Sequence, residues 1–288
     1  ELGIPVGKDS LSMQAQWQAD GQAHKTVSPV SLVVSAFAPV VDVRNQLTRL
    51  LDREVESELW LIGLGGGRQR MGGSVLSQCH PHAAGGAALP AFGGEVPDLD
   101  DPQRLRALFE LIRDAREDGL LLAYHDRSDG GVFASLCEMA FASHVGLEIQ
   151  LDGWGDGRSD DPLRVLFNEE LGAVVQVPVE ERAAFADLVA SHGLIDCAQR
   201  IARPSKTPMV RVFDEDEVLA EWRWDELFDA WWSVTHAMQR LRDNPEGADS
   251  EHAAARRFDA PGLQPTLTFD AGEDIAAPFV STGARPRV

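Results

Sequence analysis

Hydrophobic residues recur along this chain with two periods, which together predict a mixed fold of helices and strands. After a capping Asp101 and Pro102, apolar residues follow at helical spacing until Gly119, and this pattern predicts a helix. Further helices are expected from about 131 to 140, over 179–192 and over 225–241. Strands are expected over 27–41, 58–64, 120–124, 147–151, 173–177, 208–212 and 218–222. This alternation indicates an α/β (α+β) fold.

The same pattern divides the chain into three parts. We predict that residues 1–41 end one domain, that 42–225 form a second, α/β domain, and that 226–288 form a helix and a connector. The connector is rich in Pro, Gly, Asp and Ala and has few apolar anchors. Because the chain starts without Met inside a loop-strand pattern, we expect it to be an internal fragment of a longer protein.

Composition narrows the possible partners. Lys and Arg number 26 against 46 Asp and Glu, a net charge of −20 that would repel nucleic acid and anionic membrane surfaces. The sequence has no apolar stretch long enough to span a membrane and no secretory signal, so we expect no membrane association and a cytoplasmic location. The three cysteines show no Cys-x-x-Cys pair, which predicts reduced thiols without a disulfide or zinc site.

The loop 125–131, His-Asp-Arg-Ser-Asp-Gly-Gly, carries the strongest chemical signal. Asp126 and Asp129 are short carboxylates suited to Mg²⁺, and Ser128 can donate a hydrogen bond to a phosphate oxygen. The following glycines open a helix, whose N-terminus favours anions. Residue chemistry alone leaves a magnesium-nucleotide site and a simple turn, in which Asp129 caps the helix, about equally supported.

A second polar loop lies near the start of the chain. Gly7, Lys8, Asp9 and Ser10 are residue types that contact phosphate and Mg²⁺, although they do not match the P-loop pattern. By residue chemistry alone, an ordinary turn is favoured here.

Other candidate motifs are better explained by structure. Gly63–Gly67 lacks the helix and the acidic residue of a dinucleotide fingerprint, so we interpret it as a flexible glycine turn. At Asn168–Glu170 the carboxylates could face a metal, but a structural interpretation is favoured, with Glu169 and Glu170 facing solvent at a helix end. The adjacent Cys79 and His80 would point apart. Packing at a domain junction is expected of four tryptophans, Trp222, Trp224, Trp231 and Trp232.

Four segments taken in order resemble a known family, the large single-chain phosphoribosylformylglycinamidine synthases. The segments are Ile4–Met13, Ser28–Ser35, Tyr124–Gly131 and Leu166–Gly172. The resemblance implies the end of an aminoimidazole-ribonucleotide-synthetase-like N-terminal domain up to about residue 41, followed by the C-terminal-type α/β domain. It also implies a glutaminase domain of the same chain beyond the connector.

The family's reaction belongs to de novo purine biosynthesis. It uses ATP to phosphorylate the amide oxygen of formylglycinamide ribonucleotide, and ammonia released from glutamine then displaces phosphate to give the amidine. The resemblance therefore implies a ligase with Mg²⁺ and ATP or ADP as cofactors, and implies that this piece alone is inactive.

Motif by motif, the resemblance makes Asp126 a Mg²⁺ ligand and Ser128 a nucleotide contact. It places Gly7, Lys8 and Ser10 at the phosphates of ATP and substrate, although Lys8-Asp9 departs from the Asn-containing segment of smaller relatives. The family holds one catalytic and one structural nucleotide, and the loop 125–131 resembles the structural site. A noncatalytic, nucleotide-holding module is therefore the alternative function, and a selenophosphate- or thiamine-phosphate-kinase-like relative is a third.

Overall fold

The computed structural model describes residues 3–4, 6–7, 13–28, 33–40, 43, 46–83, 92–152, 161–263, 265–278, 280 and 283. The chain divides into two compact units, residues 1–45 and 46–288. Within the described part, none of the helices is both long and apolar enough to cross a membrane.

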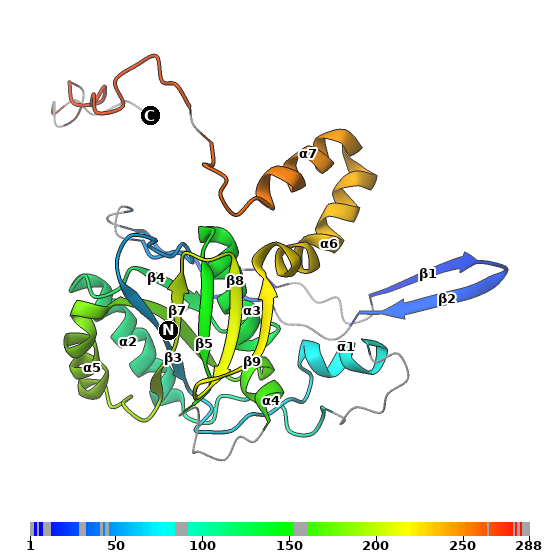
Figure 1. Cartoon of the computed structure of the whole chain (residues 1–288), viewed down its shortest axis with the longest axis horizontal. Helices are drawn as coiled ribbons and strands as arrows, with labels where there is room; N and C mark the ends of the chain where they lie inside the picture. The colour runs from blue at the N-terminus through cyan, green and yellow to red at the C-terminus, as the bar shows by residue number, and fades with distance from the viewer. Residues whose placement is uncertain are drawn as a thin grey trace. The chain divides into compact units, whose positions relative to one another are not determined.

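The first unit contains a two-stranded hairpin (Figure 1). β1 (Gln14–Ala19) pairs antiparallel with β2 (Gln22–Val27), and both residues of the tight turn between them, Asp20 and Gly21, have positive φ. The strand predicted over 27–41 is wrong for residues 33–40, which form no strand; 29–32 and 41 lie outside the described residues. An apolar run becomes a strand only when it has a hydrogen-bonding partner, and residues 33–40 have none within the described part of the chain.

The second unit is built on a seven-stranded sheet with the order β4-β6-β3-β7-β5-β8-β9. The strands are β3 (Ser57–Gly63), β4 (Ala123–Asp126), β5 (Gly146–Gln150), β6 (Gly172–Pro178), β7 (Ala198–Ser205), β8 (Met209–Asp214) and β9 (Glu217–Arg223). β5 and β8 run parallel, whereas the other described neighbours run antiparallel. This mixed sheet with helices confirms the predicted α/β (α+β) class.

The helices of this unit are α1 (Val75–Ala83), α2 (Pro102–Glu117), α3 (Gly131–Ser143), α4 (Pro162–Phe167), α5 (Arg182–Ser191), α6 (Trp224–Arg242) and α7 (Pro245–Ala255). The structure confirms the predicted helices that correspond to α2, α3, α5 and α6. Asp101 caps α2 as expected, its side chain accepting a hydrogen bond from the Gln103 amide at 2.9 Å. The connector predicted after residue 243 contains α7, which begins at Pro245 behind an Asn244 cap.

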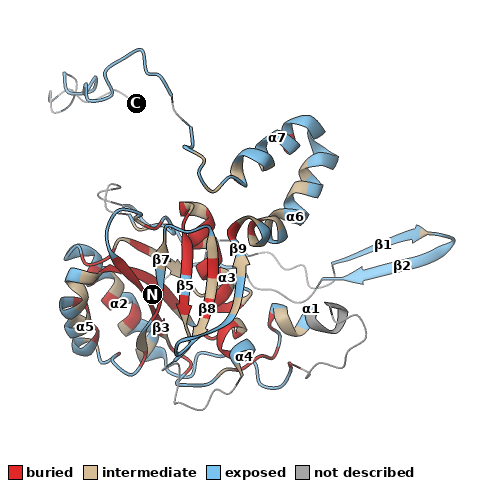
Figure 2. Ribbon diagram, in the orientation of Figure 1, coloured by how far each residue is buried: buried red, intermediate tan, exposed pale blue. Residues whose placement is uncertain are grey.

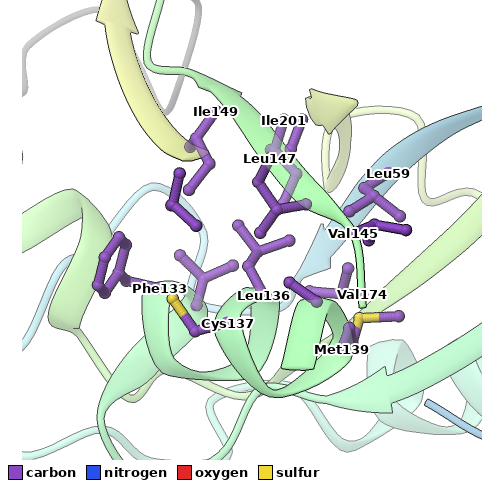
Figure 3. Close-up of a cluster of buried hydrophobic side chains, with 14 of the residues drawn as sticks. Leu59, Phe133, Leu136, Cys137, Met139, Val145, Leu147, Ile149, Val174 and Ile201 are labelled. Carbon is purple, nitrogen blue, oxygen red and sulfur yellow. The ribbon is translucent and has the colours of Figure 1, made fainter. Parts of the chain in front are cut away.

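Two hydrophobic cores lie on opposite faces of the sheet. On β3, Leu59 and Leu61 belong to the core that contains α3, whereas Trp60 and Ile62 belong to the core formed with α2 and α5. Figure 2 shows that the buried positions concentrate in the central strands and in α3. Figure 3 shows Leu136 and Met139 of α3 pointing toward strand residues that include Val174. The sheet is therefore the middle layer, and α3 packs against one of its faces.

The tryptophan-rich segment packs inside this same unit. Trp224 is fully buried, its indole nitrogen donates to the Ala140 carbonyl at 3.3 Å, and its ring stacks on Phe228. Trp231 is 42% exposed. The predicted packing role is confirmed for Trp224, but its contacts with α3 lie within the unit 46–288 and not at a domain junction.

Candidate functional site

Three loops meet at one edge of the sheet, where β3 and β4 end and β6 begins. They are the glycine turn 63–67, the loop 127–130 and the segment 168–171. Because β6 runs antiparallel to both β3 and β4, its first residues lie beside their last ones. β4 extends through Asp126, so the strand predicted over 120–124 starts and ends later than expected.

Asp126 presents an exposed carboxylate at this edge. Its Oδ1 accepts a hydrogen bond from the Tyr124 hydroxyl at 2.5 Å. Burial and this bond to a carboxylate raise the pKa of Tyr124. Tyr124 therefore stays protonated and fixes the orientation of Asp126, whose second oxygen has no bond to any described residue and could bind a cation.

Ser128 makes its bonds within the loop. Its hydroxyl donates to the Asp126 carbonyl at 3.1 Å, and its amide donates to the Ser135 hydroxyl at 3.2 Å. These bonds hold the loop against the first turn of α3. The side chain is partly exposed, so its hydroxyl could also accept a bond from a ligand.

The N-terminus of α3 is occupied by a carboxylate from elsewhere in the chain. Gly130, the N-cap residue, has a φ of 84°, and its amide donates to Oε1 of Glu169 at 2.8 Å. The same oxygen accepts a bond from the amide of Val75, the first residue of α1, at 2.8 Å. The interpretation in which Asp129 caps the helix is therefore wrong, because Glu169 takes that position and ties two helix N-termini together.

Next to it, Glu170 forms a buried ion pair. It is 1% exposed, and its carboxylate accepts bonds from Nε and Nη2 of Arg70, each at 2.7 Å. Arg70 also contacts Asp100 at 2.8 Å, and these carboxylates raise its pKa. Asn168 is buried and bonds the carbonyls of residues 164 and 165. A structural role for Asn168–Glu170 agrees with these contacts, but the predicted solvent-facing position is wrong for Glu170, whose carboxylate is buried against Arg70.

Arg127 connects the loop 127–130 to the segment 168–171. Its guanidinium donates to the carbonyls of Glu170 and Leu171, the latter at 2.9 Å. It lies over the cross-strand pair Gly63 and Gly172, where a Cβ would stand 3.5 Å and 3.2 Å from its Nη2. Burial lowers the pKa of Arg127 to about 10. The sequence analysis did not identify Arg127 as a site residue. The available signal was a pair of glycines, because Gly63 ends β3 and Gly172 begins β6, and neither has a side chain to fill the space that Arg127 occupies.

The second predicted loop falls mostly on residues outside the described part of the chain. Gly7 is exposed in the first unit, whereas Lys8, Asp9 and Ser10 lie outside the described residues. Their phosphate contacts therefore stay predictions. The same holds for Mg²⁺ at Asp126, because the described residues contain no group of three His, Cys, Asp or Glu side chains placed to hold a metal.

The cysteines are all free thiols. Cys79 is exposed, whereas Cys137 and Cys197 are buried, and burial raises the pKa of both buried thiols. Neither is activated for nucleophilic chemistry, because the reactive form is the thiolate.

Comparisons with known proteins match this arrangement. Residues 56–215 match the family model "AIR synthase related protein, C-terminal domain", and residues 1–39 match "FGAR-AT PurM_N-like domain". Both matches confirm the resemblance predicted from the four motifs.

Several solved structures are similar to this chain. Thermotoga maritima PurL complexed with FGAR is 18% identical, with a TM-score of 0.53 over 64% of this chain and 30% of that chain. The same protein complexed with ATP is 16% identical, with a TM-score of 0.49 over 64% and 27%. E. coli HypE, a hydrogenase maturation protein, is 18% identical, with a TM-score of 0.39 over 58% and 48%. The chain thus spans less than a third of the PurL chains that it matches.

The match over residues 56–215 covers more than half of the chain and includes the whole edge of the sheet described above. The chain therefore belongs to the family of AIR synthase related proteins, of which it contains the C-terminal domain.

Proposed function

We propose that this chain is part of a phosphoribosylformylglycinamidine synthase, an ATP-dependent ligase of purine biosynthesis. The observation that carries the proposal is the order of the two family matches, an FGAR-AT PurM_N-like segment followed by the AIR synthase related domain. The second match alone does not specify an activity. The first match, over residues 1–39, supports the FGAR-AT branch.

In the proposed reaction, ATP phosphorylates the amide oxygen of formylglycinamide ribonucleotide, releasing ADP. Ammonia from glutamine then attacks the activated carbon, and phosphate leaves to give the amidine. Thermotoga maritima PurL has been captured with ATP and with FGAR, which supports these two ligands here. A glutaminase domain as the ammonia source and a cytoplasmic location belong to the same proposal.

Asp126 and Ser128 are the residues that we propose for the nucleotide and its Mg²⁺. The second carboxylate oxygen of Asp126 suits a hard cation, which would neutralise phosphate charge when bound. Because this carboxylate is oriented by Tyr124, it requires little rearrangement to bind a cation. Lys8, Ser10 and Gly7 are proposed at the phosphates of ATP and substrate.

The test is turnover by the natural protein that contains residues 1–288. With ATP, Mg²⁺, glutamine and formylglycinamide ribonucleotide, we expect ADP and the amidine product in equal amounts. Omission of the ribonucleotide should abolish ADP release. ADP release that ignores the ribonucleotide, or none under any condition, would contradict the proposal.

A second candidate is a module that holds a nucleotide for structural purposes. It is favoured by the contacts that fix the loop 127–130 in place. Glu169 accepts a hydrogen bond from the Gly130 amide, and Arg127 donates hydrogen bonds to the carbonyls of Glu170 and Leu171. In the natural protein, Asp126→Asn distinguishes the two functions, with Asp118→Asn as a control outside the site. Loss of copurifying ADP with unchanged turnover per folded molecule supports the structural function, whereas a selective loss of turnover supports catalysis.

A further inference from the structure

Arg127 differs from the other arginines in how its charge is balanced. Among the described arginines, Arg49, Arg53 and Arg127 make no ion pair, and the first two are exposed. Arg127 is partly buried, and its side-chain bonds go to the main-chain carbonyls of Glu170 and Leu171. The nearby carboxylate of Glu170 is already bonded by Arg70. A partly buried cation without an anionic partner is costly, so an anion beside it would be stabilised.

A small cavity lies beside this guanidinium. It has a volume of about 80 Å³ and is lined by Arg127, Arg68, Asn168 and the glycine turn, among other residues. Asp196 also lines it, but this carboxylate is bonded by Arg104 at 2.8 Å. By this measure one water needs about 10–15 Å³. The cavity therefore has room for several waters or for a small tetrahedral anion.

The glycine turn lines the same cavity through Gly63, Gly65 and Gly67. Gly67 is exposed and has a φ of 78°. Residues with side chains rarely adopt this backbone conformation, and it lets the amides approach an anion closely. The turn that sequence analysis interpreted as flexible thus stands beside the unpaired arginine.

We propose that this cavity binds one phosphoryl group of a phosphate-bearing small molecule, held by Arg127 and the glycine turn. The site is separate from the Asp126 carboxylate, which the strand alternation places away from the neighbouring side chain of Arg127. The inference deepens the proposed function, since its reactants carry phosphate, and names Arg127 as a binding residue.

Isothermal titration of the natural protein with inorganic phosphate, ribose 5-phosphate and ribose tests this site. Three variants are compared: Arg127→Met, Gly63→Ala and Arg53→Met. Arg53→Met removes the same charge from an exposed, unpaired arginine. Gly63→Ala adds a methyl group at ordinary contact distance, 3.5 Å from Arg127, so it narrows the cavity without forcing the backbone to move.

We expect the natural protein to bind one phosphate per chain. The dissociation constant for phosphate should rise at least tenfold in Arg127→Met and severalfold in Gly63→Ala, and change less than twofold in Arg53→Met. If Arg127→Met does not fold, Gly63→Ala decides. Tighter binding of ribose 5-phosphate than of phosphate indicates an ester ligand, the reverse order indicates free phosphate, and ribose should not bind. Equal phosphate binding by the natural protein and both site variants would overturn the proposal.

This titration is independent of turnover. A protein that binds phosphate through Arg127 but releases no ribonucleotide-dependent ADP contradicts the proposed function alone. A protein that turns over the ribonucleotide but binds phosphate equally without Arg127 contradicts the phosphate site alone.

Discussion

At the scale of single residues, two buried carboxylates form ion pairs with arginines, Glu170 with Arg70 and Glu58 with Arg182. Glu170 and Glu58 are each 1% exposed. Replacing Glu170 with Gln leaves Arg70 buried without its principal partner, and breaking such a pair costs about 3–5 kcal/mol. We expect urea denaturation of Glu170→Gln to show a loss of this size.

The exposed pair Arg106–Glu110 provides the control, because exposed pairs contribute about 0–1 kcal/mol. Glu110→Gln should change the free energy of unfolding by no more than that. Equal losses in the two variants would show that the Arg70–Glu170 pair does not stabilise the fold.

Glu58 should make the free energy of unfolding depend on pH. Burial would raise its pKa, but hydrogen bonds from Arg182 and Arg200 outweigh this effect, and the net pKa is lowered. The unfolded chain therefore takes up this proton at a higher pH than the folded one, near the ordinary value of about 4.3. The stabilisation is fully present above that pH and is lost as the pH falls through the folded pKa.

Glu58→Gln should therefore be less stable than the natural sequence at pH 7, and this difference should shrink as the pH drops below about 4. Chemical denaturation at several pH values measures it, and Glu148→Gln on β5, an exposed position, is the control. A difference that does not change with pH would show that the proton is not linked to folding at Glu58.

Sequence chemistry found part of the site. Asp126 and Ser128 were predictable because their loop follows a strand and precedes a helix. Glu169, Arg127 and Arg70 were not, since each acts on a residue distant in the sequence, such as Val75 for Glu169. Periodicity does not report such contacts.

At the scale of elements, β5 depends on a glycine. A Cβ at Gly146 would collide with the carbonyl oxygens of Thr207 and Met209, which are backbone atoms of the segment leading into β8. Gly146→Ala must therefore separate β5 from β8 or distort both, and overpacking of this kind costs about 1–3 kcal/mol. Thermal unfolding followed by circular dichroism measures the loss.

Gly93→Ala is the matched control, since nothing lies within 4 Å of a Cβ there. It should unfold at the temperature of the natural sequence. An unchanged midpoint in Gly146→Ala would show that this close approach does not limit the β5–β8 pairing.

The elements that sequence patterns found are those with strong periodicity, such as α2 and β3. β7 was missed because its apolar positions are few: Ile201 and Ala202 face the core, whereas Arg200 and Arg203 bond Glu58 across the sheet. α1 contains Pro81, which argues against a helix from local propensity alone. In these cases tertiary contacts decided the structure.

At the scale of the whole molecule, neither hydrophobic core includes a described residue before Leu47. The α2–α5 core includes Leu47 at its margin, and the α3 core includes Leu51, which is 4% exposed. Asp52 also bonds the fully buried Gln176 through main-chain groups, at 2.8 Å and 2.9 Å. The domain boundary proposed at 41/42 can therefore be examined by truncation.

Removal of residues 1–45 should leave the urea midpoint and slope of the remaining chain unchanged, because no described core residue is lost. Removal of residues 1–56 also takes Leu47, Leu51 and the Asp52–Gln176 bonds. Loss of the buried Leu51 side chain alone costs about 2–5 kcal/mol, so this shorter chain should unfold at much lower urea. If the first truncation alone abolished cooperative unfolding, the second unit would depend on the hairpin unit for its fold, and the two could not be separate domains.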